Sequence, residues 1–214
     1  MGNVSAPFGF VQRQGTGASP TYEFASGFNN GSIAYNASAI YYGDPVTRAS
    51  SSSGTLIQAV GSAGNSTITM AGIFYGCKYL STAQKRTVWS NYWPGSDVAS
   101  TAQSTIESYV VNDPNAQFLV QSDSTGLAQA TAIGAQFDFA IGTGTTANGL
   151  SGAYLLHTPG SNASWPFRCV DLVFDPPGAN GTIQGANVST ASPYNYAIVA
   201  FNNVETRVTT TYNG

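Results

Sequence analysis

Short apolar runs, each cut off by residues that favour turns, follow one another along most of this chain. The runs are rich in β-branched and aromatic residues, and clusters of Gly, Asn, Ser and Pro separate them. Runs of this length with such boundaries are typical of strands. They predict an all-β protein, an antiparallel β-sandwich or barrel. The expected strands are 39–42, 56–60, 68–75, 88–93, 109–111, 117–121, 136–141, 153–156, 167–174 and 196–204.

Two of these runs differ in how their apolar residues are spaced. In 136–141, Phe137, Phe139 and Ile141 alternate with polar or small residues, which predicts a half-exposed strand. Run 196–201 is apolar on both faces, which predicts a strand covered by two layers or by a neighbouring subunit. The longest helix candidate is 101–110, whose Thr and Ser content disfavours a helix.

Turn signals divide the runs at regular intervals. Asn-Gly pairs at 30–31, 148–149 and 180–181 supply the positive-φ residues that tight hairpins need. Asp-Pro steps at 44–45, 113–114 and 175–176 each follow an apolar run, and we expect them to end strands.

The first 24 residues have no sustained period and contain several prolines and glycines. Residues 1–24 are therefore expected to form an extended N-terminal arm, and Phe8 and Phe10 must dock on the body or on a partner. Residues 25–214 are expected to form one β-rich domain, with a separate subdomain as the alternative.

Composition narrows the possible functions. Only 8% of the residues are charged, with a single His and a net charge of −3. No basic stripe or apolar span is present, so neither a nucleic acid nor a membrane is expected as partner. Two cysteines in a chain of 214 residues do not make a disulfide framework, so we expect Cys77 and Cys169 to be buried free thiols, with a disulfide as the alternative.

Catalytic patterns are weak. The segment 149–153 is similar to a nucleophile elbow around Ser151, but its base would have to be His157, only six residues away. One His and two distant Cys do not match a zinc-ligand spacing. We therefore expect no catalytic residue, no metal and no cofactor. A hydrolase stays open only if an esterase activity is lost on Ser151→Ala.

The aromatic residues Trp89, Tyr92 and Trp93 allow two interpretations. Aromatic rings beside Asn and Ser suit carbohydrate recognition. The favoured interpretation is that they lie at the rim of the core or in a subunit interface.

Ten segments, taken in order, resemble the capsid cement, or decoration, proteins of tailed bacteriophages, particularly short-tailed ones. They are PFGFVQRQG, AIYYGDPV, GTLIQAV, GIFYGCKYL, YWPG, ESYVVNDPNAQFLVQ, IGAQFDFA, GLSGAYLL, FRCVDLVFDPPGAN and YAIVAFNNVE. The resemblance rests on order and spacing from about Pro7 to Glu205. It implies a non-enzymatic virion structural protein, made in the host bacterial cytoplasm, that binds the outer capsid surface and locks major capsid protein subunits together. It also implies a homotrimer.

These expectations assign residues to two kinds of contact. The expected capsid or partner contacts are Phe8, Phe10, Arg13, Arg48 and Arg168. The expected oligomer interface contains Trp89, Tyr92, Trp93, Tyr196, Ile198 and Phe201. The alternative function is a carbohydrate-binding or adhesin β-sandwich module.

Overall fold

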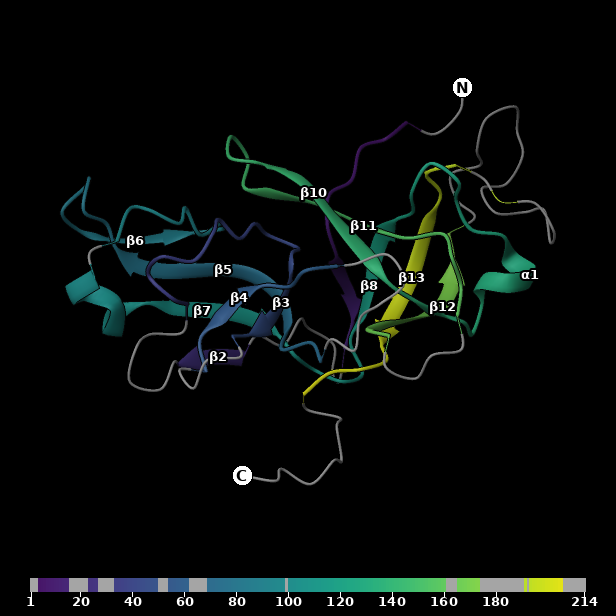
Figure 1. The fold of residues 1–214 in the computed structure, drawn as a ribbon, viewed down its shortest axis with the longest axis horizontal. Coiled ribbons are helices and arrows are strands. Elements are labelled where there is room, and N and C mark those ends of the chain that lie inside the picture. Colours follow the sequence, from purple (N-terminus) through teal and green to yellow (C-terminus); the bar gives the residue numbers. More distant parts are fainter. Residues whose placement is uncertain are drawn as a thin grey trace.

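Almost all of the regular structure is antiparallel sheet, which confirms the all-β prediction (Figure 1). A computed structural model describes residues 4–15, 23–26, 33–49, 54–61, 69–98, 100–160, 165–173, 191 and 193–205. Strands form a five-stranded sheet, a six-stranded sheet and a separate hairpin, and none of these closes into a barrel.

The five-stranded sheet brings together strands from both ends of the chain. Its order is β1 (Val11–Gln14), β8 (Gln117–Gln121), β13 (Tyr196–Phe201), β12 (Phe167–Leu172) and β9 (Gln136–Phe137). Every neighbouring pair is antiparallel. Of the neighbours on this path, β12 and β13 alone are consecutive in the described order of strands, so the sheet depends mainly on contacts that are distant in sequence.

The six-stranded sheet occupies the other half of the molecule (Figure 1). Its main path is β2 (Glu23–Ser26), β7 (Glu107–Val111), β5 (Gly72–Leu80), β3 (Pro45–Arg48) and β4 (Leu56–Gln58). The sixth strand, β6 (Thr87–Ser90), pairs with the second half of β5. The long strand β5 is therefore the centre of this sheet.

A hairpin of β10 (Phe139–Thr145) and β11 (Leu150–Leu155) connects the two halves (Figure 1). Phe139 and Leu155 at its base are buried in the core of the five-stranded sheet. Near its turn, the Asn91 side chain donates to Asn148 O at 2.7 Å. The hairpin thus packs on the five-stranded sheet and is hydrogen-bonded to the loop that follows β6 of the six-stranded sheet.

Each large sheet has its own hydrophobic core. One is dominated by phenylalanines from the five-stranded sheet, and the other surrounds Trp93. Strand β5 contributes to both, since Ile73 belongs to the first core and the next residue, Phe74, to the second. Alternate side chains of a strand point to opposite faces, so this one strand joins the two cores.

The N-terminal segment is extended, as predicted, but it is part of the body. Phe10 is 0% exposed and its ring lies 4.3 Å, centroid to centroid, from that of Phe167. The expectation that Phe10 contacts a partner is therefore wrong, because pairing of β1 with β8 carries its side chain into the core. Phe10 N also donates to Gly43 O at 2.9 Å, where a Cβ on Gly9 would lie 2.8 Å from that oxygen.

Two local predictions are wrong for identifiable reasons, and the helix candidate forms no α-helix. The candidate 101–110, whose composition disfavours a helix, contains a 3-10 helix, Ser100–Thr105, and most of strand β7, which pairs with β5 and includes the strand expected at 109–111. Run 39–42 forms only isolated bridges at Ile40 and Tyr42. The step at 44–45 begins a strand, since a proline without an N–H is tolerated at the first strand position.

Other predictions are confirmed or refined. Cys77 and Cys169 are buried free thiols, and burial raises the pKa of each to about 12. The 148–149 pair lies in the connection between β10 and β11, where Gly149 has φ of 71°. Asp138 is buried, so run 136–141 is not half-exposed: it divides into β9 and β10, which belong to different sheets.

Other local predictions concern segments only partly described. The step at 113–114 follows the end of β7 at Val111, as expected. The turns expected at 30–31, 175–176 and 180–181 lie outside the described residues. Helices are short in the described part: besides the 3-10 turn there is α1 (Gln129–Ala132), and no described helix has the length and apolar character needed to cross a bilayer.

Candidate functional site

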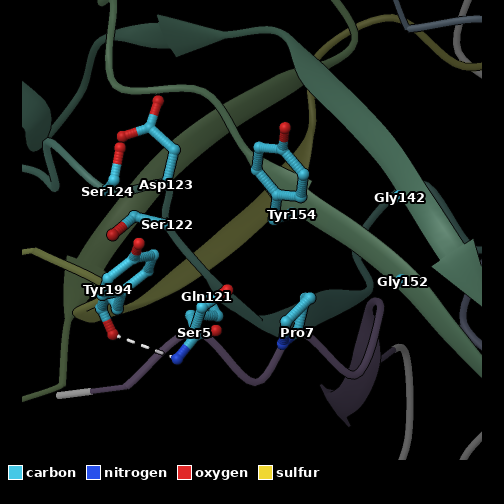
Figure 2. A pocket seen from close by; sticks show the side chains of 10 residues that line it. All are labelled: Ser5, Pro7, Gln121, Ser122, Asp123, Ser124, Gly142, Gly152, Tyr154 and Tyr194. Carbon is cyan, nitrogen blue, oxygen red and sulfur yellow. Dashed lines mark hydrogen bonds between the residues drawn. The ribbon is translucent and has the colours of Figure 1, made fainter.

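A hollow of about 310 Å³ opens where the N-terminal segment, the end of β8 and the β10–β11 hairpin meet (Figure 2). Tyrosine rings, small residues and neutral polar groups form most of its wall. The lining residues are Ser5, Pro7, Gln121, Ser122, Asp123, Ser124, Gly142, Gly152, Tyr154 and Tyr194.

Gln121 fixes one wall of this hollow. Its side-chain oxygen accepts from Ala6 N at 2.9 Å, and its side-chain nitrogen donates to Val4 O at 3.0 Å. The same nitrogen lies 3.3 Å from Tyr194 O (Figure 2). Gln121 is 1% exposed, and its side-chain amide hydrogen-bonds to backbone groups as a peptide group of a neighbouring strand would. These hydrogen bonds hold the N-terminal segment beside β8.

Asp123 is the charged group of the wall. Burial raises the pKa of its carboxyl, but hydrogen bonds from the His157 ring and backbone, Thr125 N and Gly126 N more than offset this and hold that pKa below 3.8. The His157 Nδ1 atom lies 2.6 Å from Asp123 Oδ2. Asp123 is therefore ionised near neutral pH, and its oxygens are already occupied by donors of this chain.

Tyr194 adopts a backbone conformation that is rare for an aromatic residue, with φ of 55°. Its N–H donates to Asp123 O at 2.9 Å. The next residue, Asn195, is fully buried, and its side chain accepts from Ser122 Oγ and donates to Leu127 O. This buried hydrogen-bond network holds the backbone of Tyr194 in its strained conformation.

Two glycines face each other across the hairpin side of the hollow. Gly142 and Gly152 are directly paired in the register of β10 and β11. A Cβ on Gly152 would lie 2.6 Å from Thr143 O, and one on Gly142 would lie 3.0 Å from Gly152 O. No larger side chain fits without a backbone shift, so this part of the wall consists of backbone alone.

A second feature is the outer face of the six-stranded sheet. Trp89 is 67% exposed, and in the register it lies opposite Lys78, which lies opposite Glu107 on the next strand. Lys78 Nζ is 2.7 Å from Glu107 Oε1 and 6.0 Å from the centre of the Trp89 ring. Leu80, 39% exposed, lies two residues beyond Lys78 on the same face.

The outer face of the five-stranded sheet carries a row of apolar residues. Val11, Leu119 and Ile198 are opposite one another in three adjacent strands, and all three are half-buried. Arg168 is exposed and pairs with Ala200 on the same face. Asp171, also exposed, lies opposite Ile198, so the apolar row on this face is bordered on β12 by one cation and one anion.

Several predicted contact residues lie on or beside the outer face of the five-stranded sheet, which we call the Ile198 face. The rings of Phe8 and Tyr196 are 5.9 Å apart, and Tyr196 shares a face with Ile198. Arg13 is exposed at the irregularity in the pairing of β1 with β8. Arg48 is elsewhere: its guanidinium lies 2.8 Å from Glu205 Oε2 and also donates to Gly54 O, so it makes contacts within the chain.

Two of the residues expected at an oligomer interface are buried in the cores, and a third makes a ring contact within the chain. Trp93 and Phe201 are both 0% exposed and belong to the two cores, so their assignment is wrong. The Tyr92 ring stacks on Tyr41 with their centres 5.8 Å apart, so it is already partnered within the chain. Trp93 and Phe201 are buried by sheet packing that the linear sequence does not display, while Tyr92 is half-buried.

Ser151 and His157 do not share a site. The Ser151 hydroxyl donates to the buried carboxylate of Asp44 at 2.5 Å, while His157 bonds to Asp123. Among the described residues no three His, Cys, Asp or Glu side chains gather as a metal site would require. Neither tyrosine of the hollow was predicted from the sequence, because Tyr154 and Tyr194 are distant in the chain and only the fold brings them together.

Comparisons with protein-family models, with curated proteins and with solved structures find no match to this chain.

Proposed function

We propose that this chain is a non-enzymatic virion structural protein that binds the outer surface of a tailed-phage capsid. In this role it bridges neighbouring major capsid protein subunits and stabilises the contacts between them. The resemblance of ten ordered segments between Pro7 and Glu205 to capsid cement proteins supports the proposal.

The observation that carries the proposal is that two different sheets each present apolar side chains at the surface, one face around Trp89 and one around Ile198. A tryptophan that is 67% exposed is a large apolar group in water, and tryptophan is enriched at the centres of protein interfaces. Lys78 and Glu107 flank it with an ion pair that is itself partly exposed. An aromatic anchor beside a polar rim is what a protein partner requires.

The second face, around Ile198, supports contact with more than one partner at once. It lies on a different sheet from Trp89, and its apolar row has Arg168 nearby. A cement protein needs one surface for the shell and another for copies of itself. We assign the Ile198 face, with Phe8 and Arg13, to the capsid and the Trp89 face to a homotrimer. This differs from the expectation from the sequence, which placed Tyr196 and Ile198 in the oligomer interface, because the two faces lie on different sheets.

Sedimentation with particles tests the proposal. Shells that lack the protein are mixed with purified protein and pelleted, and the bound amount is measured against the major capsid protein. We expect saturation at a fixed ratio, and loss of binding for Ile198→Asp. Val60→Asp is the matched control, since Val60 is exposed and lies on neither face. Absence of co-sedimentation at any concentration would contradict the proposal.

The alternative is a carbohydrate-binding or adhesin module that uses the Trp89, Tyr92 and Trp93 platform. Burial of Trp93 and stacking of Tyr92 on Tyr41 leave Trp89 as the exposed ring of that trio. A glycan-array signal abolished by Trp89→Ala, without particle binding, would favour this alternative.

A further inference from the structure

We propose that the hollow between Tyr154 and Tyr194 binds one ring of an uncharged saccharide. The inference goes beyond capsid binding and does not depend on it, because it is argued from the residues that line the hollow, which borders the Ile198 face where Gln121 pairs with Tyr196. It also differs from the Trp89 platform, since none of its lining residues belongs to that trio.

The shape of the hollow suits a small ring. Its volume of about 310 Å³ is at the lower end of ligand pockets, which begin near 300 Å³. Figure 2 shows the rings of Tyr154 and Tyr194 on different sides of the space, one from β11 and one from the segment before β13. Aromatic faces are apolar and accept the C–H face of a sugar ring.

The glycine pair opens the wall beside Tyr154. Since Gly142 and Gly152 carry no side chain, backbone forms the surface there. At Gly152 even a methyl group would need a backbone shift, and at Gly142 it would be tight against Gly152 O. A flat ligand can therefore approach the strands closely, which is one reason that glycine is found at binding sites.

Some polar groups of the wall are already hydrogen-bonded within the chain, and others are available to a ligand. Gln121 and Asp123 are used within the chain and keep the wall rigid. The phenol oxygens of Tyr154 and Tyr194 and the hydroxyl of Ser124 make no hydrogen bond to another described residue. Hydroxyls both donate and accept, as saccharide hydroxyls do, so they pair with such a ligand in either direction.

Charge selects against anionic sugars, and the Asp123 oxygens, which already accept from Thr125, Gly126 and His157, are poorly placed to attract a cationic one. The ten lining residues include the Asp123 carboxylate and no Lys or Arg. An anionic ligand would be repelled by Asp123 and would find no cation to replace its hydration. The wall therefore favours a neutral hexose or N-acetylhexosamine unit.

The backbone of Tyr194 is independent evidence for a function. A positive φ at an aromatic residue is strained, and such strain persists where the surroundings enforce it, often at binding sites. Here Asp123 O, Gln121 and the buried Asn195 enforce it. The enforced backbone conformation places the Tyr194 ring at the hollow before any ligand binds.

Saturation-transfer NMR on the isolated protein tests the inference. The probes are the methyl glycosides of glucose, galactose, mannose and N-acetylglucosamine, each at millimolar concentration. Glucose 6-phosphate and tetramethylammonium serve as the anionic and cationic probes. We expect transfer to at least one neutral glycoside, little transfer to the phosphate and little to the ammonium ion.

Two variants locate the site. Tyr154→Ala and Tyr194→Gly are each expected to weaken binding by about tenfold, the loss of one good aromatic contact. Glycine at 194 also relieves the positive φ, so this variant keeps its fold, which a thermal melt verifies. Lys85→Gly is the matched control: Lys85 has φ of 54° but lies in the β5–β6 turn, and its replacement leaves binding unchanged.

Three outcomes would overturn the inference. They are the absence of transfer to every neutral glycoside, transfer that survives in both tyrosine variants, and preferential binding of tetramethylammonium, which would make the hollow a cation site. Because no particles are present, these outcomes do not bear on capsid binding. Failure of co-sedimentation likewise leaves the saccharide inference standing.

Discussion

The hydroxyl of Ser151 donates to the carboxylate of Asp44 across 2.5 Å, and both side chains are buried. Ser151 lies in the hairpin, while Asp44 immediately precedes β3 of the six-stranded sheet. Asp44 also accepts from Tyr41 N and Gln58 Nε2, each at 2.7 Å. One carboxyl group therefore joins the hairpin to the sheet at the point where the two halves meet.

Replacing Asp44 by Asn should make stability less sensitive to pH. Burial raises the pKa of the Asp44 carboxyl above 3.8, despite hydrogen bonds from Ser151, Tyr41 and Gln58 that lower it. The folded protein thus binds this proton more tightly than the unfolded chain, and ionisation of Asp44 lowers stability as pH rises through the raised pKa. In urea unfolding between pH 4 and pH 7, the free energy of unfolding of Asp44→Asn should increase relative to that of the wild type as pH rises. Asp171→Asn, on an exposed residue, is the control, and parallel curves for Asp44→Asn and wild type would contradict the prediction.

Phe10→Ala should destabilise the protein by about 3–5 kcal/mol, the usual cost of truncating a buried phenylalanine. Its ring stacks on Phe167 and meets Phe139 edge to face, so the cavity would lie in the larger core. Denaturant unfolding measures the loss, with Arg13→Ala on the exposed part of β1 as control. For the same reason deletion of residues 1–15 should prevent folding. A stable truncated protein would show that this segment is a dispensable arm.

Trp89→Ala should affect assembly and leave stability almost unchanged, whereas Trp93→Ala should lower the stability of the fold. Because Trp89 is exposed, its removal should change the free energy of unfolding by less than about 0.5 kcal/mol and abolish trimerisation. Trp93 is fully buried, so its removal should cost about 3–5 kcal/mol. Light scattering and urea unfolding separate the two effects. A Trp89→Ala protein that still forms trimers would remove that face from the interface.

Asp123→Asn should weaken stability at neutral pH and remove part of its acid dependence. The pKa of this carboxyl is below 3.8 in the folded protein, so its ionised form stabilises the fold above that pH. That contribution is lost as pH falls through the lowered pKa. An acid titration followed by tryptophan fluorescence should show a shallower transition in the variant. An identical acid transition in both proteins would be inconsistent with this account.

Capsid binding should survive moderate salt and should raise the temperature at which particles release their DNA. A protein that binds across subunit seams prefers the intact lattice and stabilises it by linkage. With only 8% of residues charged, apolar contacts carry most of the binding, and these are not screened. Heating decorated and bare particles at low and high ionic strength tests both points. If decorated and bare particles released DNA at the same temperature, the stabilising role would be contradicted. If moderate salt removed the protein from the particles, the apolar character of the binding would be contradicted.

The sequence by itself determined the all-β class, the position of several strands and the buried, unpaired state of the two thiols. Apolar runs bounded by turn residues are local signals, and 117–121 coincides with β8. Two distant cysteines in apolar surroundings likewise predicted the buried free thiols that are observed. Such features depend on neighbours within a few residues, so a linear pattern contains the information.

Only the tertiary structure decided which apolar residues are buried and which groups meet. Trp89 and Trp93 are four residues apart in similar surroundings, yet Trp89 on β6 stays exposed, while a bridge to Ile40 and contact with the Tyr79 ring place Trp93 in a core. Phe10 likewise became a core residue through pairing of β1 with β8, more than a hundred residues away. Tyr154, Tyr194 and Gln121 form one hollow because strands far apart in the chain are neighbours in the fold. Burial and proximity are properties of the whole packed chain, so no local pattern specifies them.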